Sequence, residues 1–312
     1  MSLKFKSIDK TEWDHLILSN HVDNLFYQSI YHDVLNKHYK TNCSYYLVID
    51  ENEKYLALPV FHRKRDAALL THFFYQAVYI KESISERKKI EAFDLLVSSL
   101  LKLYDKIDFK LDPKVVDVRS FVWNGFESKT YYSYHVDLAR DLNYSENINR
   151  QLKKYSKILK VERLQSLDKE LIESHIRDMI KNGLGKSEAE KVRGWINNFF
   201  EIGILDVFEL RDSESKEQGS AIYLRDKNAA YLIAIKSNNS SQALLYDKVF
   251  EQYRTEKISH IDLLGANIQN VAIYKSQFDA QLISYHIVSY RKNKVWESVK
   301  KAIKLKIKSI YK

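Results

Sequence analysis

The chain has 312 residues, of which 45% are hydrophobic and 13% aromatic, enough to build full cores and to exclude global disorder. A chain of this length favours two domains over one. Its net charge of +9 suits an anionic partner such as RNA or a membrane surface, although a solvated, Lys-rich surface is the simpler explanation.

Cys43 is the only cysteine, which excludes an intramolecular disulfide and a Cys-rich zinc site. It lies in the apolar run CSYYLVI and is expected to be a small buried hydrophobe. No apolar window has the length of a membrane helix, and the N-terminus lacks the apolar region of a signal peptide. We therefore expect a cytoplasmic protein without a transmembrane segment.

In the first half, apolar periodicity and turn signals predict a strand, two helices, a hairpin, another strand, a long helix and three closing strands. The expected elements are 3–8, a helix around Trp13, a helix after Ser29, then 44–49, 55–61, 73–80, 85–104, 106–111, 116–121 and 130–137.

The second half predicts a basic helix, a strand, two helices, an antiparallel meander, a helix, and then a strand, a Gly turn, a short helix and a strand. The expected ranges are 145–159, 160–164, 168–182, 187–200, 204–210, 219–224, 229–235, 241–254, 258–263 and 282–290, followed by a basic amphipathic helix over 294–312. The two halves share this order, which predicts a structural repeat with the ligand between the copies.

Six short sequence signatures follow one another along the chain. They are LFYQSIYHDVL, LALPVF, HFFYQAVYI, VRSFVWNGFESKTYYSYHVDL, NINRQLKKYSKILKVE and IDLLGANIQNVAIYKSQFDAQLISYHIV. In this order they resemble the Fem-type aminoacyl and acyl transferases, the FemAB-like branch of the GNAT superfamily. The resemblance implies an α/β (α+β) fold of two tandem GNAT-like domains, each a mixed, mainly antiparallel sheet flanked by helices. The implied ranges are 1–138 and 139–293, with the basic helix 294–312 at the end.

The resemblance also implies a reaction, the transfer of an acyl or aminoacyl group to an amino group of a cell-envelope precursor or sugar, without a covalent enzyme intermediate. The implied donor is either aminoacyl-tRNA or acyl-CoA, with no metal, and the acceptor is a small or lipid-linked amine. A sugar N-acetyltransferase that uses acetyl-CoA, and a non-catalytic module that binds RNA or an anionic glycolipid, are the alternatives. The sequence departs from the family at Leu264 and at Asp279, where glycine is more usual after the Phe.

The closing motif supplies the candidate catalytic residues. Lys275 matches the lysine of the family's Lys-Phe helix and would stabilise an oxyanion or a terminal phosphate, unless it is a solvated helix lysine. Asp262 ends an apolar strand and would orient the acceptor amine or accept its proton, or else cap the following turn. Gly265 would permit a tight turn or a close approach of substrate.

Other side chains are candidates for substrate binding, each with a structural alternative. Tyr231 and Tyr274 would donate to a carbonyl or diphosphate, or simply pack. Gln76 is a polar residue in an aromatic strand and would bond to substrate or, as the structural alternative, to backbone. Arg119 would clamp an anion or pair with Asp117.

Two basic helices are candidate contacts for anionic partners. Lys153 and Lys154 lie on the helix NINRQLKKYSKILK, which would contact phosphates, as in tRNA, or form a solvated face. The helix 294–312 would either rest on an acidic membrane surface, giving a peripheral location at the inner face, or dock on the body of the protein.

Two kinds of site are missing from the sequence. The segment after strand 229–235 reads KSNNSSQALLYDKVF and lacks the Gly-rich pyrophosphate loop, which argues against ordinary acetyl-CoA use without excluding an acyl-CoA. The histidines are scattered, so His72 and His260 are expected to be structural and no metal cluster is predicted.

Overall fold

A computed structural model describes residues 2–51, 53–67, 70, 74–238 and 241–292. The elements of the first half are β1 (Lys4–Ile8), α1 (Lys10–Ser19), η1 (Leu25–Tyr27), α2 (Ser29–Tyr39), β2 (Asn42–Asp50), β3 (Glu53–His62), β4 (Asp66–Ala67), β5 (Tyr79–Ile80), α3 (Glu86–Leu103), β6 (Lys106–Lys110), α4 (Arg119–Trp123) and β7 (Glu127–Asp137). The elements of the second half are α5 (Glu146–Tyr155), β8 (Leu159–Arg163), α6 (Lys169–Lys181), α7 (Lys186–Glu201), β9 (Leu205–Asp212), β10 (Glu217–Arg225), β11 (Ala229–Ser237), α8 (Gln242–Thr255), β12 (His260–Asp262), α9 (Gln269–Lys275), η3 (Ser276–Phe278) and β13 (Gln281–Arg291).

Local signals in the sequence set the starts of four helices. The side chains of Asp9, Ser85, Ser145 and Asp168 accept hydrogen bonds from backbone amides in the first turns of α1, α3, α5 and α6. Each such N-cap satisfies a donor that the helix itself leaves unpaired. The expected order of helices and strands is therefore largely confirmed.

Two predicted strands are wrong in kind or extent. The segment predicted as a strand at 116–121 contains the short helix α4, because the Asp117 carboxylate binds the amide and guanidinium of Arg119 and begins a helical turn. Of the strand predicted at 73–80, only β5 forms within the described residues. Gln76 instead makes an isolated bridge to Leu111, which draws this segment away from the four-stranded sheet.

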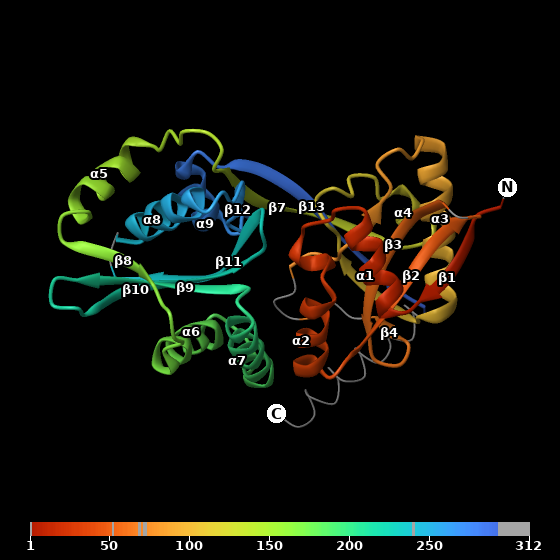
Figure 1. Cartoon of the computed structure of the whole chain (residues 1–312), viewed down its shortest axis with the longest axis horizontal. Coiled ribbons are helices and arrows are strands. Elements are labelled where there is room, and N and C mark those ends of the chain that lie inside the picture. The colour runs from red at the N-terminus through yellow and green to blue at the C-terminus, as the bar shows by residue number, and fades with distance from the viewer. Residues whose placement is uncertain (1, 52, 68–69, 71–73, 239–240, 293–312) are drawn as a thin grey trace, which may run out of the picture.

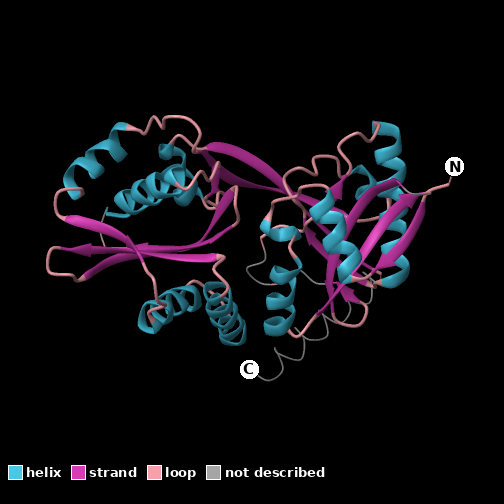
Figure 2. Ribbon diagram, in the orientation of Figure 1, coloured by secondary structure: helices cyan, strands magenta, loops and turns pink. Residues whose placement is uncertain are grey.

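Within the described residues the strands form two sheets, with orders β1-β2-β3-β5 and β4-β6-β13-β7-β12-β11-β10-β9-β8. Figures 1 and 2 show two lobes: an N-terminal lobe with the four-stranded sheet, and a C-terminal lobe that extends from α5 to α9. The long strands β7 and β13 run between the lobes as an antiparallel pair, with Leu282 opposite Tyr134 and Ser289 opposite Glu127. The nine-stranded sheet is thus continuous through both lobes.

The strand β13 follows the C-terminal lobe in sequence but ends in the N-terminal lobe. Its last residues pair with β6, with Ile287 opposite Lys110 and Arg291 opposite Lys106. At about 3.3 Å per residue, an 11-residue strand is long enough to serve both lobes. The boundaries predicted at 138 and 293 remain a proposal.

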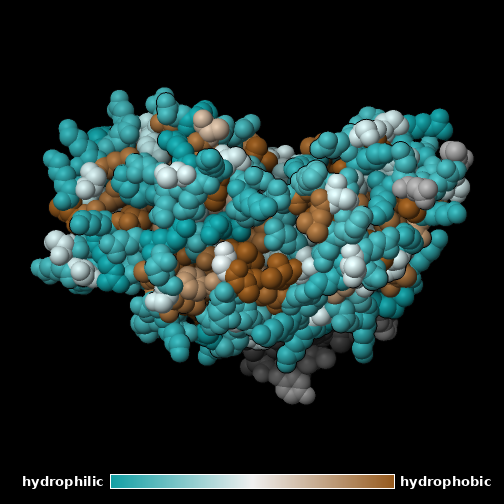
Figure 3. All heavy atoms as spheres, in the orientation of Figure 1, coloured by the Kyte–Doolittle hydropathy of each residue, from teal (hydrophilic) through white to brown (hydrophobic). Residues whose placement is uncertain are grey.

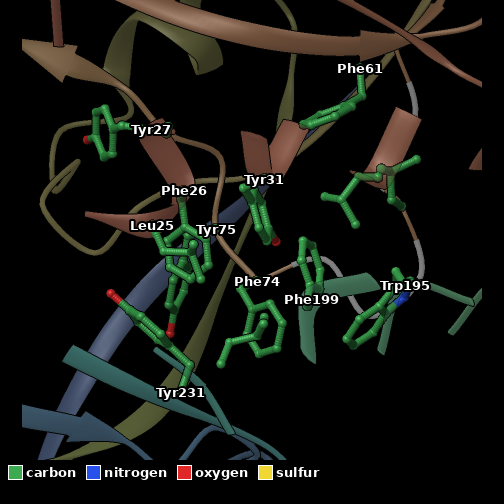
Figure 4. Close-up of a cluster of buried hydrophobic side chains, with 14 of the residues drawn as sticks. Leu25, Phe26, Tyr27, Tyr31, Phe61, Phe74, Tyr75, Trp195, Phe199 and Tyr231 are labelled. Atoms are coloured by element: carbon green, nitrogen blue, oxygen red, sulfur yellow. The ribbon is translucent and has the colours of Figure 1, made fainter. Parts of the chain in front are cut away.

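A buried cluster rich in aromatic residues joins the lobes at α2 and α7 (Figure 4). The Tyr31 and Phe199 rings stack with centroids 5.3 Å apart, and Trp195 donates its indole N–H to the Tyr39 hydroxyl at 3.3 Å. Gly194 allows this close packing, since a Cβ there would lie 2.3 Å from His38 Nδ1. The space-filling view shows hydrophobic residues gathered at the surface between the lobes (Figure 3). One of the buried clusters is therefore shared by the two lobes.

None of the helices in the described ranges has the length and apolar character that a bilayer crossing requires. The helix predicted over 294–312 lies outside the described residues.

Candidate active site

A cavity of about 560 Å³ opens between the lobes. It is lined by residues 20–24 and Phe26, Tyr75, Glu82, Asp112, Pro113, Lys114, His135, Asp226, Asn228, Ala229, Tyr231, His260, Asp262 and Ile283. A second cavity of about 600 Å³ shares Asn20, Val22, Glu82 and Lys114 with the first. We call the first the inter-lobe cavity and the second the side cavity.

The sheet register gathers polar side chains on the wall of the inter-lobe cavity. Asp262 of β12 lies opposite His135 of β7 and beside Tyr231 of β11. Because alternate residues of a strand share a face, Ser133 lies on the same face as His135. The polar cluster is therefore built where three neighbouring strands meet below the loops of the N-terminal lobe.

Asp262 is fully buried and accepts four hydrogen bonds. Its Oδ2 accepts from the Tyr75 hydroxyl at 2.8 Å and from His135 Nε2 at 3.1 Å. Its Oδ1 accepts from the Ser133 hydroxyl and from the amide of Leu264. Burial raises the pKa of Asp262, but the bonds from His135, Ser133 and Leu264, and the charge of protonated His135, outweigh this and leave the net pKa below its usual range.

His135 connects this buried carboxylate to the cavity. With Nε2 donating to Asp262, the neutral ring presents Nδ1 as a hydrogen-bond acceptor. Its ring stacks on that of His260, with centroids 5.5 Å apart. Burial, aided by the charge of His135, lowers the pKa of His260. A carboxylate, an imidazole and an open cavity in this order can accept a proton from a bound ligand.

Asp112 is a second buried acid on the cavity wall, with only 5% of its surface exposed. Its Oδ1 accepts from the amide of Lys114 at 2.9 Å, but no cationic side chain in the described part of the chain reaches salt-bridge distance. Burial raises the pKa of Asp112, and the nearby charges of Lys114 and His135 lower it in part. An acid in this position would be stabilised by a cationic ligand.

Lys275 is buried rather than solvated, and it lies next to the cavity wall without lining either cavity. Its ammonium donates to the carbonyl oxygens of Leu263 at 2.6 Å and Leu264 at 2.9 Å. Burial lowers the pKa of Lys275 to about 8, although the charge of Asp262 opposes the shift. Gly265 has φ +63°, and a Cβ there would lie 3.3 Å from Lys275 Nζ. The structure therefore brings Lys275, Asp262 and Gly265 together around one turn.

Both departures from the family pattern occur at left-handed backbone positions. Leu264 has φ 52° and Asp279 has φ 57°, a region that favours glycine. The Asp279 side chain accepts from the amide of Asn143 at 3.2 Å, which offsets part of the backbone cost.

The two candidate tyrosines are placed differently. Tyr231 lines the inter-lobe cavity, where its hydroxyl accepts from Asn24 Nδ2 at 3.2 Å and keeps its own proton free to donate. Burial holds the pKa of Tyr231 well above its ordinary value, so the hydroxyl stays protonated. Tyr274 packs against Phe278 in the C-terminal lobe, and its hydroxyl is buried without a hydrogen-bond partner among the described residues.

The remaining sequence candidates lie away from both cavities. Gln76 is buried and donates to the carbonyl of Pro59. Arg119 pairs through two nitrogens with Asp117 and stacks on Trp123. Lys153 and Lys154 are exposed on α5, in the outer part of the C-terminal lobe (Figure 1). For Gln76 and Arg119 the observed contacts are the structural alternatives, and their roles in binding remain predictions.

Sequence reasoning missed His135, Tyr75, Ser133 and Asp112. A signal did exist for two of them, since Ser133 and His135 stand two residues apart in the predicted strand YYSYHVD and must share a face. Tyr75 and Asp112 come from segments whose approach to Asp262 depends on the docking of the lobes. No local pattern could have revealed them.

Within the described ranges, no three His, Cys, Asp or Glu side chains group as ligands for a metal ion. No family model and no curated protein sequence matches the chain.

Solved structures do match it in fold. FemX superposes with a TM-score of 0.60 at 11% identity, covering 91% of this chain and 96% of FemX. A tandem GNAT protein from the clavulanic acid biosynthesis pathway gives a TM-score of 0.54 at 10% identity, covering 92% of this chain and 98% of that one. The C-terminal domain of a protein described as a lysylphosphatidylglycerol synthetase of Agrobacterium fabrum gives 0.53 at 10% identity, covering 89% and 90% of the two chains.

These similarities extend over nearly the whole chain and are similarities of fold. The protein has the α/β fold of tandem GNAT-like domains. The resemblance to the FemAB-like branch that the sequence signatures predicted is confirmed at this level.

Proposed function

We propose that this tandem GNAT-fold protein transfers an acyl or aminoacyl group to a primary amine in the inter-lobe cavity, with His135 as the general base. One observation carries the proposal: the ring that lines the cavity is also held by the fully buried carboxylate of Asp262. A buried acid that orients an imidazole fixes the tautomer and stabilises the imidazolium that forms when the base accepts a proton.

The reaction requires an unprotonated amine, because an ammonium ion has no lone pair for attack. The acceptor would enter as ammonium, held by the charge of Asp112, and would give a proton to Nδ1 of His135. The amine nitrogen then attacks the carbonyl carbon of the donor. As the adduct collapses, the bond from that carbon to the donor's sulfur or oxygen breaks and the leaving group takes up the proton held by His135. The former amine nitrogen releases its second proton to solvent, which leaves a neutral amide.

The carbonyl oxygen gains negative charge during this attack. Tyr231 is placed to donate to it, since its hydroxyl lines the cavity and its proton is not used by another group in the described part of the chain. The earlier role of Lys275, stabilisation of an oxyanion or phosphate, also remains a proposal. Its observed contacts suggest an indirect form of that role, in which it fixes the carbonyls next to Asp262.

The donor is either aminoacyl-tRNA or acyl-CoA. Two names among the structural neighbours support keeping both donor classes: one structure is described as a tandem GNAT protein without AcCoA, and another as a lysylphosphatidylglycerol synthetase. We propose an amine on an envelope precursor, lipid or sugar as the acceptor, and exposed lysines of α5, including Lys153 and Lys154, as contacts for an anionic donor or carrier.

The test is a transfer assay with two donors, acetyl-CoA and lysyl-tRNA, against amines that include glucosamine and a lysine-containing peptide, read by mass spectrometry of the product. For any pair that reacts, His135→Gln should lower kcat by about 10²–10⁴-fold. His286→Gln is the matched control, because His286 lies on β13 outside both cavities. No transfer from either donor class, or an unchanged rate in His135→Gln, would overturn the proposal.

A further inference from the structure

Lys110, the last residue of β6, is a partly buried lysine held between two aromatic rings. Its Nζ lies 4.8 Å from the centroid of the Tyr75 ring and 4.9 Å from that of Tyr285. These two rings meet edge to face, with centroids 5.4 Å apart and planes at 77°. One ammonium group therefore contacts the ring of a residue that binds Asp262 and the ring of a residue on the bridging strand β13.

Within the part of the chain that the structure describes, no acid lies at ion-pair distance from Lys110. Among the described residues, none of the ion pairs or hydrogen bonds involves its ammonium, whereas Lys106 on the same strand lies 3.4 Å from Asp66 and 3.8 Å from Asp108. Burial lowers the pKa of Lys110 to about 8, although the charge of Asp262 opposes the shift. The two rings favour the charged form, because a cation over an aromatic face gains roughly 0.5–2 kcal/mol. We expect Lys110 to be largely charged at neutral pH.

We propose that Lys110 is a positioning residue for the Asp262–His135 pair and acts through Tyr75. This inference rests on the proposed function, in which that pair is the general base. The geometry is a chain of contacts: Lys110 sits on the Tyr75 ring, and the Tyr75 hydroxyl donates to Asp262 Oδ2 at 2.8 Å. His135 Nε2 donates to the same oxygen at 3.1 Å.

The shared oxygen makes the arrangement sensitive to Lys110. A hydrogen bond from Tyr75 withdraws negative charge from Oδ2, which leaves less of it to stabilise protonated His135. Loss of the cation would remove one of the contacts that position the buried Tyr75 ring and would weaken that bond. It would also remove a positive charge that interacts with Asp262 and offsets part of the carboxylate's field at the neighbouring His135 ring. Both effects have the same sign, so without Lys110 the His135 ring should bind its proton more tightly.

The experiment follows the NMR titration of the His135 ring in the full chain, with its signal assigned by its loss in His135→Gln. Lys110→Met should raise the titration midpoint of His135 by roughly 0.5–1 pH unit, the size expected for loss of one neighbouring charge. Lys110→Arg keeps the charge and the ring contact, so it should restore the wild-type midpoint. Lys106→Met is the control on the same strand and should leave the midpoint unchanged.

Tyr75→Phe tests whether Lys110 acts on His135 through the Tyr75 hydroxyl. It should shift the midpoint in the same direction, and the double variant with Lys110→Met should shift it by clearly less than the sum of the two single changes. His135 also faces His260 and Asp262 of β12 and Asp112 after β6, and all three are retained in every variant.

An unchanged midpoint in Lys110→Met, failure of Lys110→Arg to restore it, or fully additive shifts would overturn the inference. If Lys110→Met does not fold, the test passes to Tyr75→Phe. An unchanged titration midpoint of His135 in that variant would also overturn the inference. The titration needs no substrate, so its outcome is separate from that of the transfer assay. Midpoints that shift as expected in a protein without transferase activity would support the positioning role and overturn the proposed function alone.

Discussion

The Tyr75 hydroxyl of the N-terminal lobe donates a hydrogen bond of 2.8 Å to the buried Asp262 of the C-terminal lobe. A second bond crosses in the same region, from the amide of Leu25 to Asp226 at 2.8 Å. The candidate base is thus completed only when the lobes are docked, although Asp262 and His135 both come from strands of the nine-stranded sheet. Whatever holds the lobes together therefore holds the site together.

The first prediction concerns the packing of α2 against α7. Gly194→Ala should destabilise the protein by about 1–3 kcal/mol, because the new methyl group would overlap the His38 ring, which is tied to Asn198. Urea unfolding gives the measurement. Gly185→Ala at the N-cap of α7 is the control, since a Cβ there has no atom within 4 Å. It should cost clearly less stability than Gly194→Ala, namely the small preference for glycine over alanine at an N-cap. Equal stabilities of the two variants would contradict the close packing.

The second prediction concerns the binding of the acceptor. With any amine that reacts, Asp112→Asn should raise KM by tens-fold and change kcat much less, because the charge acts on the bound ammonium rather than on the proton transfer. The amide keeps an oxygen for the bond from the Lys114 amide. Asp23→Asn is the control on the same cavity, since Asp23 lies 3.7 Å from Lys227 and should not bind the ammonium. A loss confined to kcat would remove Asp112 from binding.

Much of the fold could be read from the sequence because its signals are local. The meander of β9, β10 and β11 and the helices α6 and α7 lie where apolar periodicity and turn residues place them. The strand predicted at 116–121 was wrong for an equally local reason. The Asp117 side chain caps the turn at Arg119, and this outweighs the β propensity of the valines in the segment.

The site was less predictable because it depends on long-range contacts. Asp262 and the turn at Gly265 were expected, as they follow a strand in a recognisable motif. Lys275 was expected to act from a helix surface, yet it is buried under the turn, because its two carbonyl partners replace water around the ammonium. Tyr75 is separated from Asp262 by 187 residues, so their contact could not be inferred from spacing.

The third prediction concerns acid stability. His32 is fully buried, with Nε2 donating to the Phe26 carbonyl at 2.8 Å and Nδ1 accepting from the Tyr45 hydroxyl. Burial lowers the pKa of His32 to about 4, below its ordinary value of 6.5. Between these values the unfolded chain binds a proton that the folded protein does not, so stability falls as the pH is lowered through this window. The loss from His32 should be about 1.4 kcal/mol per pH unit.

His32→Gln tests this contribution, since its amide can still donate to Phe26 but does not titrate. Denaturant unfolding from about pH 7 to about pH 4 should show a shallower loss of stability in the variant than in the wild-type protein. Burial also lowers the pKa of His175, to about 3, and this group contributes equally to both curves. Parallel curves would mean that His32 is protonated in the folded state.

The last prediction concerns the ammonium of Lys275 and applies to alkaline pH, whereas the prediction for His32 applies to acidic pH. Burial lowers the pKa of this lysine from 10.5 to about 8, so the folded protein loses the proton first as the pH rises. Above pH 8 the unfolded chain holds more protons, and this group then adds stability with increasing pH until its ordinary value is reached. Relative to Lys275→Met, the free energy of unfolding of the wild-type protein should increase by about 1.4 kcal/mol per pH unit across this window.

The difference between the two unfolding curves isolates Lys275, because Lys110 titrates in the same range in both proteins. A difference that stays flat with pH would mean that the pKa of Lys275 is the same in the folded and unfolded protein, which would contradict its burial beneath the turn beside Asp262.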